Sequence, residues 1–393
     1  QRRNYVLSQI NNSIAPTNFS ITTPSPLTVA SSTATISGKG WVNVREIRLA
    51  GSSDPRAVEW TDGNSWAVNI PVAPGSNAYQ IEAYDFSGEL IDTDTIMVDN
   101  SGTVEPASTL NLAVSELMYN PSDPTAAEVN SGFADADLFE FIELTNIGTL
   151  DVDLTEVSFT AGINYDLPAI VIPSGERVIL ARNRTAFLLR HPGMAPFLLT
   201  GEYGIGDTNK LANGGEQVVI QDGLGGDIRR FTYDDKFPWP NISDGDGPSL
   251  VLIAPDTNPD HALSSNWRAS AVSGGNPGSS DAKSFVGDPN ADLDSNGVRD
   301  LVDHALLGDG LQILSFSGST VGFEFDRDLA ADDVIVGLQV STDLSNWTDG
   351  SELFSELDPI YLGAGGQRIR YEAQSTELPA ERFFIRLQVV LTK

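Results

Sequence analysis

The sequence predicts an all-β protein in which several small β-sandwiches follow one another along the chain. Its 393 residues include 36 glycines and 22 prolines, which favour frequent turns. Between the turns lie short runs rich in Val, Ile, Thr and aromatic residues, at intervals of roughly 8–12 residues, as in sandwiches and barrels. A helical pattern is limited to residues 185–190 and residues 301–307. The length suits about two or three domains of average size.

The charge balance excludes several classes of partner. Lys and Arg number 23 and Asp and Glu number 54, which gives a formal net charge of −31. Such a surface repels nucleic acids and anionic membranes, and no run of about 18 apolar residues is present to span a bilayer. Disulfides, thiol catalysis and cysteine-based zinc sites are excluded because the chain has no cysteine. The acidity fits a secreted protein in saline or calcium-containing surroundings, or merely a well-solvated surface.

The first globular unit is expected over residues 16–100. Its strands would be residues 34–37, 44–49, 57–60, 66–70, 78–84 and 95–98, and its inward-facing positions Trp60, Trp66, Tyr79, Ile81 and Ala83. The segment PGSNAYQIEAYDFSG resembles bacterial immunoglobulin-like domains that lack the disulfide. An alternative interpretation places Trp41, Trp60 and Trp66 on a sugar-binding face, but the alternation favours core packing.

A polar linker is expected over residues 101–109, and a second unit over residues 110–280. This unit contains, in order, the segments SELMYNP, FEFIELTN, IPSGERVIL, LANGGEQVVIQD and DGDGPSLVL. The series resembles the lamin tail domain of secreted bacterial proteins. The resemblance implies an immunoglobulin-like sandwich with a binding or structural role rather than catalysis. Two departures from the family, around residues 123–137 and 185–209, are where we expect any interaction surface peculiar to this protein.

Residues 288–310 contain a twelve-residue segment with the pattern of a calcium loop. The expected oxygen ligands are Asp292, Asp294, Asn296, the carbonyl of Val298, Asp300 (directly or through water) and Asp303. Gly297 occupies the sixth position, where the loop turns sharply.

This segment resembles a single dockerin-type calcium repeat, followed by a short helix. Asp303 stands where an EF-hand has Glu, and the shorter side chain should weaken bidentate binding of Ca²⁺. Dockerins that bind cohesins carry two repeats, so a cohesin partner is not expected. We expect Ca²⁺ to act as a structural staple between domains; the alternative is an acidic turn that holds no ion.

The two ends of the chain also carry resemblances. Residues 311–393 resemble the small β-sandwich that closes many large secreted proteins of environmental bacteria. Residues 1–15, with RRNYVLSQI, resemble the closing helix of a CotH-type kinase-like domain. The second resemblance implies that the chain is the C-terminal portion of a larger polypeptide. The predicted fold class is therefore all-β, with serial immunoglobulin-like sandwiches and one short insert made of a calcium loop and a helix.

No motif predicts catalysis. His191, His261 and His304 have no metal-ligand spacing, and neither an HExxH nor a GxSxG motif occurs. Glu140 and Glu143 lie three residues apart in an expected strand, so their side chains should point to opposite faces. Asp244 and Asp246 stand in a DGDG segment, which indicates a turn or a second cation site rather than a catalytic pair.

We therefore expect a non-enzymatic structural or adhesive protein, stabilised by Ca²⁺ and secreted or held at the cell surface. Its expected partners are further copies of itself, joined by strand addition at sheet edges, without nucleic acid and without membrane insertion. The alternative is an accessory region that binds polysaccharide or protein for an upstream catalytic domain. An exposed strip involving Trp41, Trp239 or Trp347 would favour that alternative, whereas buried tryptophans and bare strand edges would favour assembly.

Overall fold

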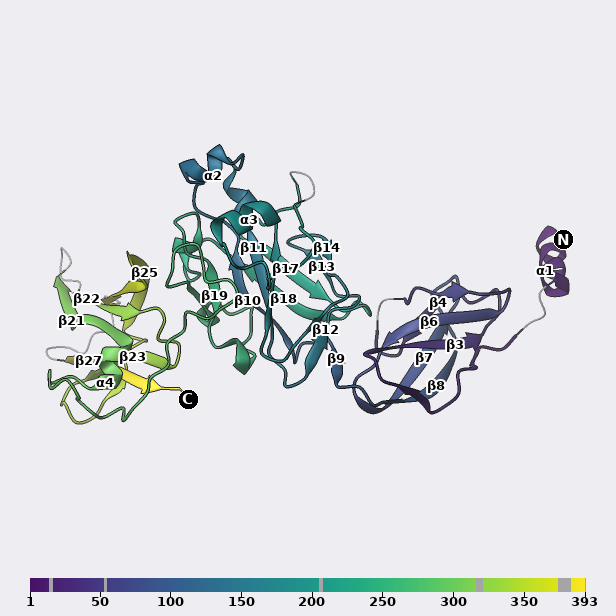
Figure 1. Cartoon of the computed structure of the whole chain (residues 1–393). Helices are drawn as coiled ribbons and strands as arrows, with labels where there is room; N and C mark the ends of the chain where they lie inside the picture. Colours follow the sequence, from purple (N-terminus) through teal and green to yellow (C-terminus); the bar gives the residue numbers. More distant parts are fainter. Residues whose placement is uncertain (14–16, 53–54, 205–207, 316–320, 374–382, 393) are drawn as a thin grey trace.

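The computed structural model describes residues 1–13, 17–52, 55–204, 208–315, 321–373 and 383–392. It shows an all-β protein, as predicted, with three β-sandwich units arranged in a row (Figure 1). A helix, α1 (Arg2–Ser13), lies at the N-terminal end of the row. None of the helices in the described residues has the length and apolar character needed to cross a membrane.

The first unit is a sandwich of two four-stranded sheets, with strand orders β1-β3-β6-β5 and β2-β8-β7-β4. Ile36, Trp66, Ile70 and Ile81 are among the residues of the core between them. Trp60 departs from the expected pattern, because it is 38% exposed on the edge strand β5. The strands are β1 (Ser20–Ile21), β2 (Leu27–Val29), β3 (Thr33–Lys39), β4 (Glu46–Leu49), β5 (Glu59–Trp60), β6 (Ser65–Pro71), β7 (Gly75–Tyr84) and β8 (Leu90–Asn100).

The middle unit contains a five-stranded sheet in the order β16-β11-β10-β19-β20, a four-stranded sheet in the order β14-β13-β17-β18, and a small sheet β15-β12-β9. A large apolar core includes residues of all three sheets. The strands are β9 (Val104–Pro106), β10 (Leu112–Met118), β11 (Phe141–Asn146), β12 (Asp151–Asp153), β13 (Ser158–Ala161), β14 (Tyr165–Asp166), β15 (Val171–Ile172), β16 (Arg177–Ala181), β17 (Glu216–Gln221), β18 (Asp227–Tyr233), β19 (Leu250–Leu252) and β20 (Trp267–Ala269).

The segments around residues 123–137 and 185–209 contain short helices that pack together on the middle unit. Glu128 of α2 closes a capping box with Thr125 and binds Arg190 of α3, with 2.9 Å between Arg190 Nε and Glu128 Oε1. Phe187 of α3 packs edge-on against Phe141 of β11, so α3 covers part of the outer face of the five-stranded sheet. The helices of this unit are α2 (Ala126–Asn130), α3 (Arg184–Arg190), and the 3₁₀ turns η1 (Ala136–Phe139), η2 (Asn241–Ser243), η3 (Pro255–Thr257) and η4 (Ser264–Asn266).

The expected polar linker at residues 101–109 contains a short strand. Val104–Pro106 form β9, which pairs in parallel with β12 of the middle unit. The sequence pattern did not reveal this strand because three residues are too few to show an alternation.

The C-terminal unit consists of a four-stranded sheet in the order β21-β22-β26-β25 and a three-stranded sheet in the order β24-β23-β27. The predicted helix after the expected calcium loop is present, but it ends at Ala305, and Leu306 begins a strand. Leu301, Ala305 and Leu306 are buried, and α4 contacts β21, β22 and β27. The elements are α4 (Asp300–Ala305), β21 (Leu306–Ser315), β22 (Val321–Asp328), β23 (Val334–Ser341), β24 (Thr348–Asp349), β25 (Phe354–Gly363), β26 (Gly366–Ala373) and β27 (Phe384–Leu391).

Candidate functional site

Arg56 of the first unit crosses to the middle unit and is only 7% exposed. Its Nη2 lies 2.5 Å from Glu156 Oε2, its Nη1 donates to the carbonyl of Gly223, and its Nε donates to the carbonyl of Asn69 in its own unit. Ser52 donates to the carbonyl of Leu224 beside it. The glycine-rich turn between β17 and β18 therefore supplies carbonyl groups that hold the first unit. We refer to these contacts as the N-terminal joint.

Arg268 of β20 forms the corresponding link to the C-terminal unit and is 3% exposed. Its Nη2 lies 2.6 Å from Asp281 Oδ1, and its Nε lies 2.6 Å from Asp332 Oδ1, just before β23. The backbone N–H of Lys283 donates to the carbonyl of Ala330. One buried guanidinium thus binds two segments at once: the segment that leaves the middle unit, and a turn of the C-terminal unit. These contacts form the C-terminal joint.

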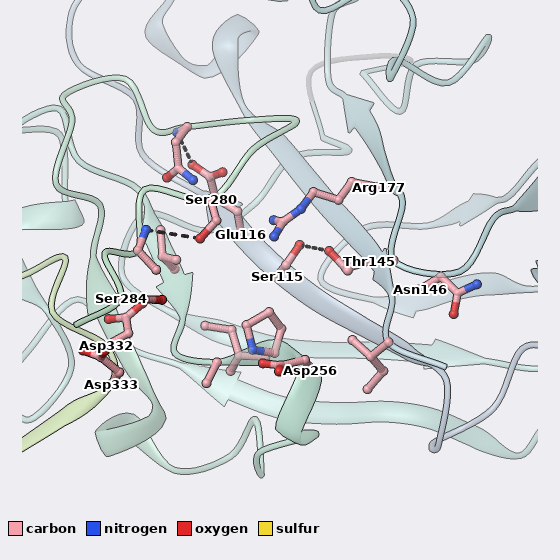
Figure 2. A pocket seen from close by; sticks show the side chains of 18 of the residues that line it. Ser115, Glu116, Thr145, Asn146, Arg177, Asp256, Ser280, Ser284, Asp332 and Asp333 are labelled. Atoms are coloured by element: carbon pink, nitrogen blue, oxygen red, sulfur yellow. Dashed lines mark hydrogen bonds between the residues drawn. The ribbon is translucent and has the colours of Figure 1, made fainter. Parts of the chain in front are cut away.

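A cleft of about 400 Å³ adjoins the C-terminal joint (Figure 2). Figure 2 shows Arg177, Ser115 and Thr145 on one side, and Asp332 and Asp333 of the C-terminal unit on the other. Hydroxyl, amide and carboxylate side chains line the cleft together with apolar residues such as Val251 and Pro255, and apolar atoms make up the larger share of its surface. Clefts between units are common ligand sites, which makes this one the candidate binding site of the chain.

Glu116 and Glu143 form a buried carboxylate pair beside this cleft. They are directly opposed in the register of β10 and β11, so their side chains emerge on the same face. Glu116 is 1% exposed and Glu143 is 0% exposed. Ser249 Oγ donates to Glu116 Oε1 across 2.5 Å, while Ser115 Oγ and Arg177 Nη1 bind Glu143 Oε1 at 2.6 Å and 2.5 Å.

The two carboxyl groups have different surroundings. Burial, and then the charge of Glu143, raise the pKa of Glu116 to about 8. Glu143 is bound by Arg177, by a hydroxyl and by the backbone N–H of Gly278, all of which favour a carboxylate. The sequence analysis did not find this pair, because the partner of Glu143 lies in another strand and is set by a β-bulge between Val114 and Glu116.

Glu140 and Glu143 do not converge, as the sequence predicted. Glu140 binds Arg182 Nη1 at 3.3 Å, Tyr203 at 3.0 Å and the N–H of Leu211 at 2.9 Å, none of which contacts Glu143. Burial raises the pKa of Glu140 to about 8 as well. Glu140 is therefore a second buried acid, separate from the joints.

The expected calcium ligands gather in part. The Asn296 amide nitrogen lies 3.1 Å from Asp294 Oδ2 and 3.2 Å from Asp303 Oδ2, so these three side chains converge. Asp292 accepts the backbone N–H groups of Asn296 and Gly297, and Gly297 has a φ of +87°, which favours glycine.

Asp300 and Val298 contribute differently. The Asp300 carboxylate accepts the N–H of Leu293 at the start of the loop, and the Val298 N–H binds Asn296 Oδ1. Across the described residues, no three His, Cys, Asp or Glu side chains are grouped so that they alone could hold a metal ion. A cation here would need Asn296 and backbone carbonyls as well as the carboxylates, which is the donor set of such loops.

The three histidines have separate surroundings. Burial lowers the pKa of His191 and of His261 to about 4. His261 Nε2 accepts the N–H of Val114, His191 packs against Phe187, and His304 binds Asp333. The structure does not bring them together.

The tryptophans do not form a single exposed strip. Trp66, Trp239 and Trp267 are buried, and Trp41 is half-buried. The guanidinium of Arg386 lies over the ring of Trp347, 4.2 Å from its centroid.

Comparisons with known proteins give only distant likenesses. No family model and no curated protein matches the chain. One similar solved structure is SGBP-B of the Bacteroides ovatus mixed-linkage glucan utilization locus in complex with a mixed-linkage heptasaccharide. That alignment has 14% identity and a TM-score of 0.14, and covers 42% of this chain and 47% of that one. The chain thus spans about half the length of that protein.

Two further solved structures show the same low similarity. The ICAM-5 D1–D4 ectodomain fragment has 8% identity and a TM-score of 0.17, with 95% of this chain and 77% of that one covered. The sialic acid binding region of the Streptococcus sanguinis SK1 adhesin has 11% identity and a TM-score of 0.16, with 81% and 94% covered. Similarity at this level does not indicate function.

Proposed function

We propose that this chain is a non-enzymatic, extracellular structural or adhesive rod that associates with further copies of itself. The observation that carries the proposal is the pair of joints, each of which is closed by one buried arginine, Arg56 or Arg268. A buried guanidinium is stable only where carboxylates and carbonyls surround it, so each joint holds a single arrangement of its two units. The resemblance of the middle unit to lamin tail domains supports the same role.

Self-association through sheet edges is favoured by the C-terminal unit. In the described residues, the outermost strands of the first two units are short, apart from β18 with 7 residues. In the C-terminal unit, β21, β25 and β27 are outermost strands of 10, 10 and 8 residues. A register shift interrupts the pairing of β21 between Leu307 and Gln312, and β25 contains Pro359, which has no backbone N–H to donate. β27 has a continuous register, no proline and a single charge, Arg386. We therefore place strand addition at β27.

Ca²⁺ is proposed to stabilise the start of α4. Asp292, Asp294, Asn296 and Asp303 would hold the ion, together with the Val298 carbonyl and with Asp300 through water. Bound Ca²⁺ would neutralise carboxylates that otherwise repel one another beside the buried end of α4. The staple would thus act inside the C-terminal unit rather than between units, because α4 packs on β21, β22 and β27.

Light scattering and negative-stain microscopy of the purified chain, with Ca²⁺ and with excess chelator, test assembly. We expect polymers of the wild-type chain and loss of polymers on Val390→Lys, which puts a charge on the 44%-exposed position of β27. Val129→Lys, at a 46%-exposed position of α2, is the matched control and should assemble normally. A monodisperse wild-type monomer in both solutions would rule out self-assembly.

The alternative function is a binding module, and the cleft at the C-terminal joint favours it. Its hydroxyl and amide lining groups suit a polar ligand such as a saccharide. A glycan and peptide binding screen with the wild type and with Ser284→Leu, at an exposed position of the cleft wall, distinguishes the two proposals. Binding that the substitution abolishes would support the module, and an empty screen would leave the structural rod.

A further inference from the structure

A row of side chains on the outer face of the five-stranded sheet connects the buried carboxylate pair to the C-terminal joint. Glu143 of β11 opposes Glu116 of β10, Glu116 opposes Val251 of β19, and Val251 opposes Arg268 of β20. Opposed residues in a sheet point to the same side. The carboxylate pair and the joint arginine therefore belong to one continuous row.

Residues 275–281 cover this row and bind both carboxylates. The Asn276 N–H donates to Glu116 Oε1 across 2.9 Å, and the Gly278 N–H donates to Glu143 Oε2 across 2.6 Å. Asp281 then binds Arg268. Gly275 permits the close approach: its φ is +81°, and a Cβ there would lie 2.2 Å from Glu116 Oε1.

The surroundings of Glu116 favour its neutral, protonated form. Glu116 Oε2 is buried and has no hydrogen-bond partner in the described residues, and the Asn276 Oδ1 is buried and unpartnered too. Two ionised carboxylates side by side without solvent would repel strongly. Burial and the neighbouring Glu143 raise the pKa of Glu116 to about 8, so Glu116 is largely neutral at pH 7.

We propose that Glu116 keeps its proton while the C-terminal joint is closed, and that loss of this proton as the pH rises places two carboxylates side by side, releases residues 275–281 and loosens the C-terminal unit. In the described residues around the pair, the cations already have carboxylate partners: Arg177 binds Glu143, Arg268 binds Asp281 and Asp332, and Lys283 at the cleft binds Asp328. Asp256 and Asp333 also line the cleft, and His191 packs on Phe141 of β11. We call Glu116, Glu143 and residues 275–281 the latch. The latch acts on the C-terminal joint whether or not the chain associates with further copies of itself.

A distance measured between the middle and C-terminal units reports directly on loosening of the joint. The chain has no cysteine, so spin labels at Leu263→Cys and Thr342→Cys, both exposed, are unique. We expect a narrow distance distribution at pH 5 in the wild type that broadens as the pH rises toward 8 and changes little above it, because the loosened state ionises Glu116 at its ordinary pKa. Far-UV circular dichroism should stay unchanged over the same range.

Two variants make the test specific. Glu116→Gln cannot ionise and should keep the narrow distribution up to pH 10. Glu140→Gln, a buried acid away from the row whose pKa is also raised to about 8, should broaden like the wild type. A wild-type distribution that stays narrow at pH 10, or broadening in Glu116→Gln equal to that of the wild type, would overturn the proposal.

Glu143→Gln gives a measurement that does not require the first variant to fold. Without the neighbouring charge the pKa of Glu116 is raised less and the repulsion between carboxylates is absent, so the broadening with pH should be weaker than in the wild type. Broadening equal to that of the wild type would contradict a role for the carboxylate pair.

Discussion

Arg268 is the residue on which the C-terminal joint depends, because two carboxylates of different segments share its guanidinium. Removing one member of a buried ion network leaves the others unpaired, which typically costs about 3–5 kcal/mol. We therefore expect Arg268→Ala to lower the free energy of unfolding by about that amount. Chemical denaturation measures it, with Arg230→Ala, which breaks an exposed pair with Asp227, as a control of much smaller effect.

Glu128 should make the middle unit sensitive to acid. Its hydrogen bond with Arg190, against the opposing effect of burial, lowers its pKa from 4.5 to about 2. A carboxylate with a depressed pKa stabilises the fold above its ordinary pKa, and this contribution is lost as the pH falls toward 2. The difference in melting temperature between the wild type and Glu128→Gln should accordingly be full above pH 5 and shrink toward pH 2. The exposed Glu89→Gln should show no such convergence.

Single residues show where prediction from sequence stops. The sequence places Glu140 and Glu143 in one strand and predicts that they diverge. They do diverge, but Glu140 lies at the end of η1, just before β11. The Glu116–Glu143 pair and the two joint arginines join segments far apart in the chain, and their alignment depends on a bulge and on docked turns. No local pattern records such contacts.

At the scale of elements, the calcium loop gives a graded prediction. Asp303→Glu restores the longer carboxylate of an EF-hand and should tighten Ca²⁺ binding, whereas Asp292→Ala should abolish it. Calorimetric titration and the shift of melting temperature with Ca²⁺ measure both effects. Equal stability of the wild type with Ca²⁺ and with chelator would show that the loop is an acidic turn.

Strands of the first unit with alternating buried positions, such as β3 and β6, were predicted close to their observed bounds, at residues 34–37 and 66–70. Strands of two or three residues, such as β1, β9 and β15, were not, because pairing with distant segments rather than alternation defines them. The charged helices α2 and α3 lie where the expected departures from the family pattern begin, and α3 matches the predicted helix at residues 185–190.

For the whole molecule, the two joints predict a rod of one length. Small-angle scattering of the wild type should fit a single extended shape, and Arg56→Ala should require an ensemble in which only the first unit moves. Glu46→Ala is the control, because it breaks only the ion pairs of Glu46 with Arg45 and Arg48 within the first unit. It should scatter like the wild type. A flexible wild-type chain would disprove locked joints.

The parallel pairing beside the N-terminal joint has a mechanical consequence. Residues 98–100 of β8 pair in parallel with β2, and β9 pairs in parallel with β12, with only residues 101–103 between β8 and β9. Tension applied to the ends of the chain would pull β8 and β9 along their own axes, so their hydrogen bonds would be sheared all at once instead of being peeled apart in sequence. A rod built in this way would resist stretching at this connection.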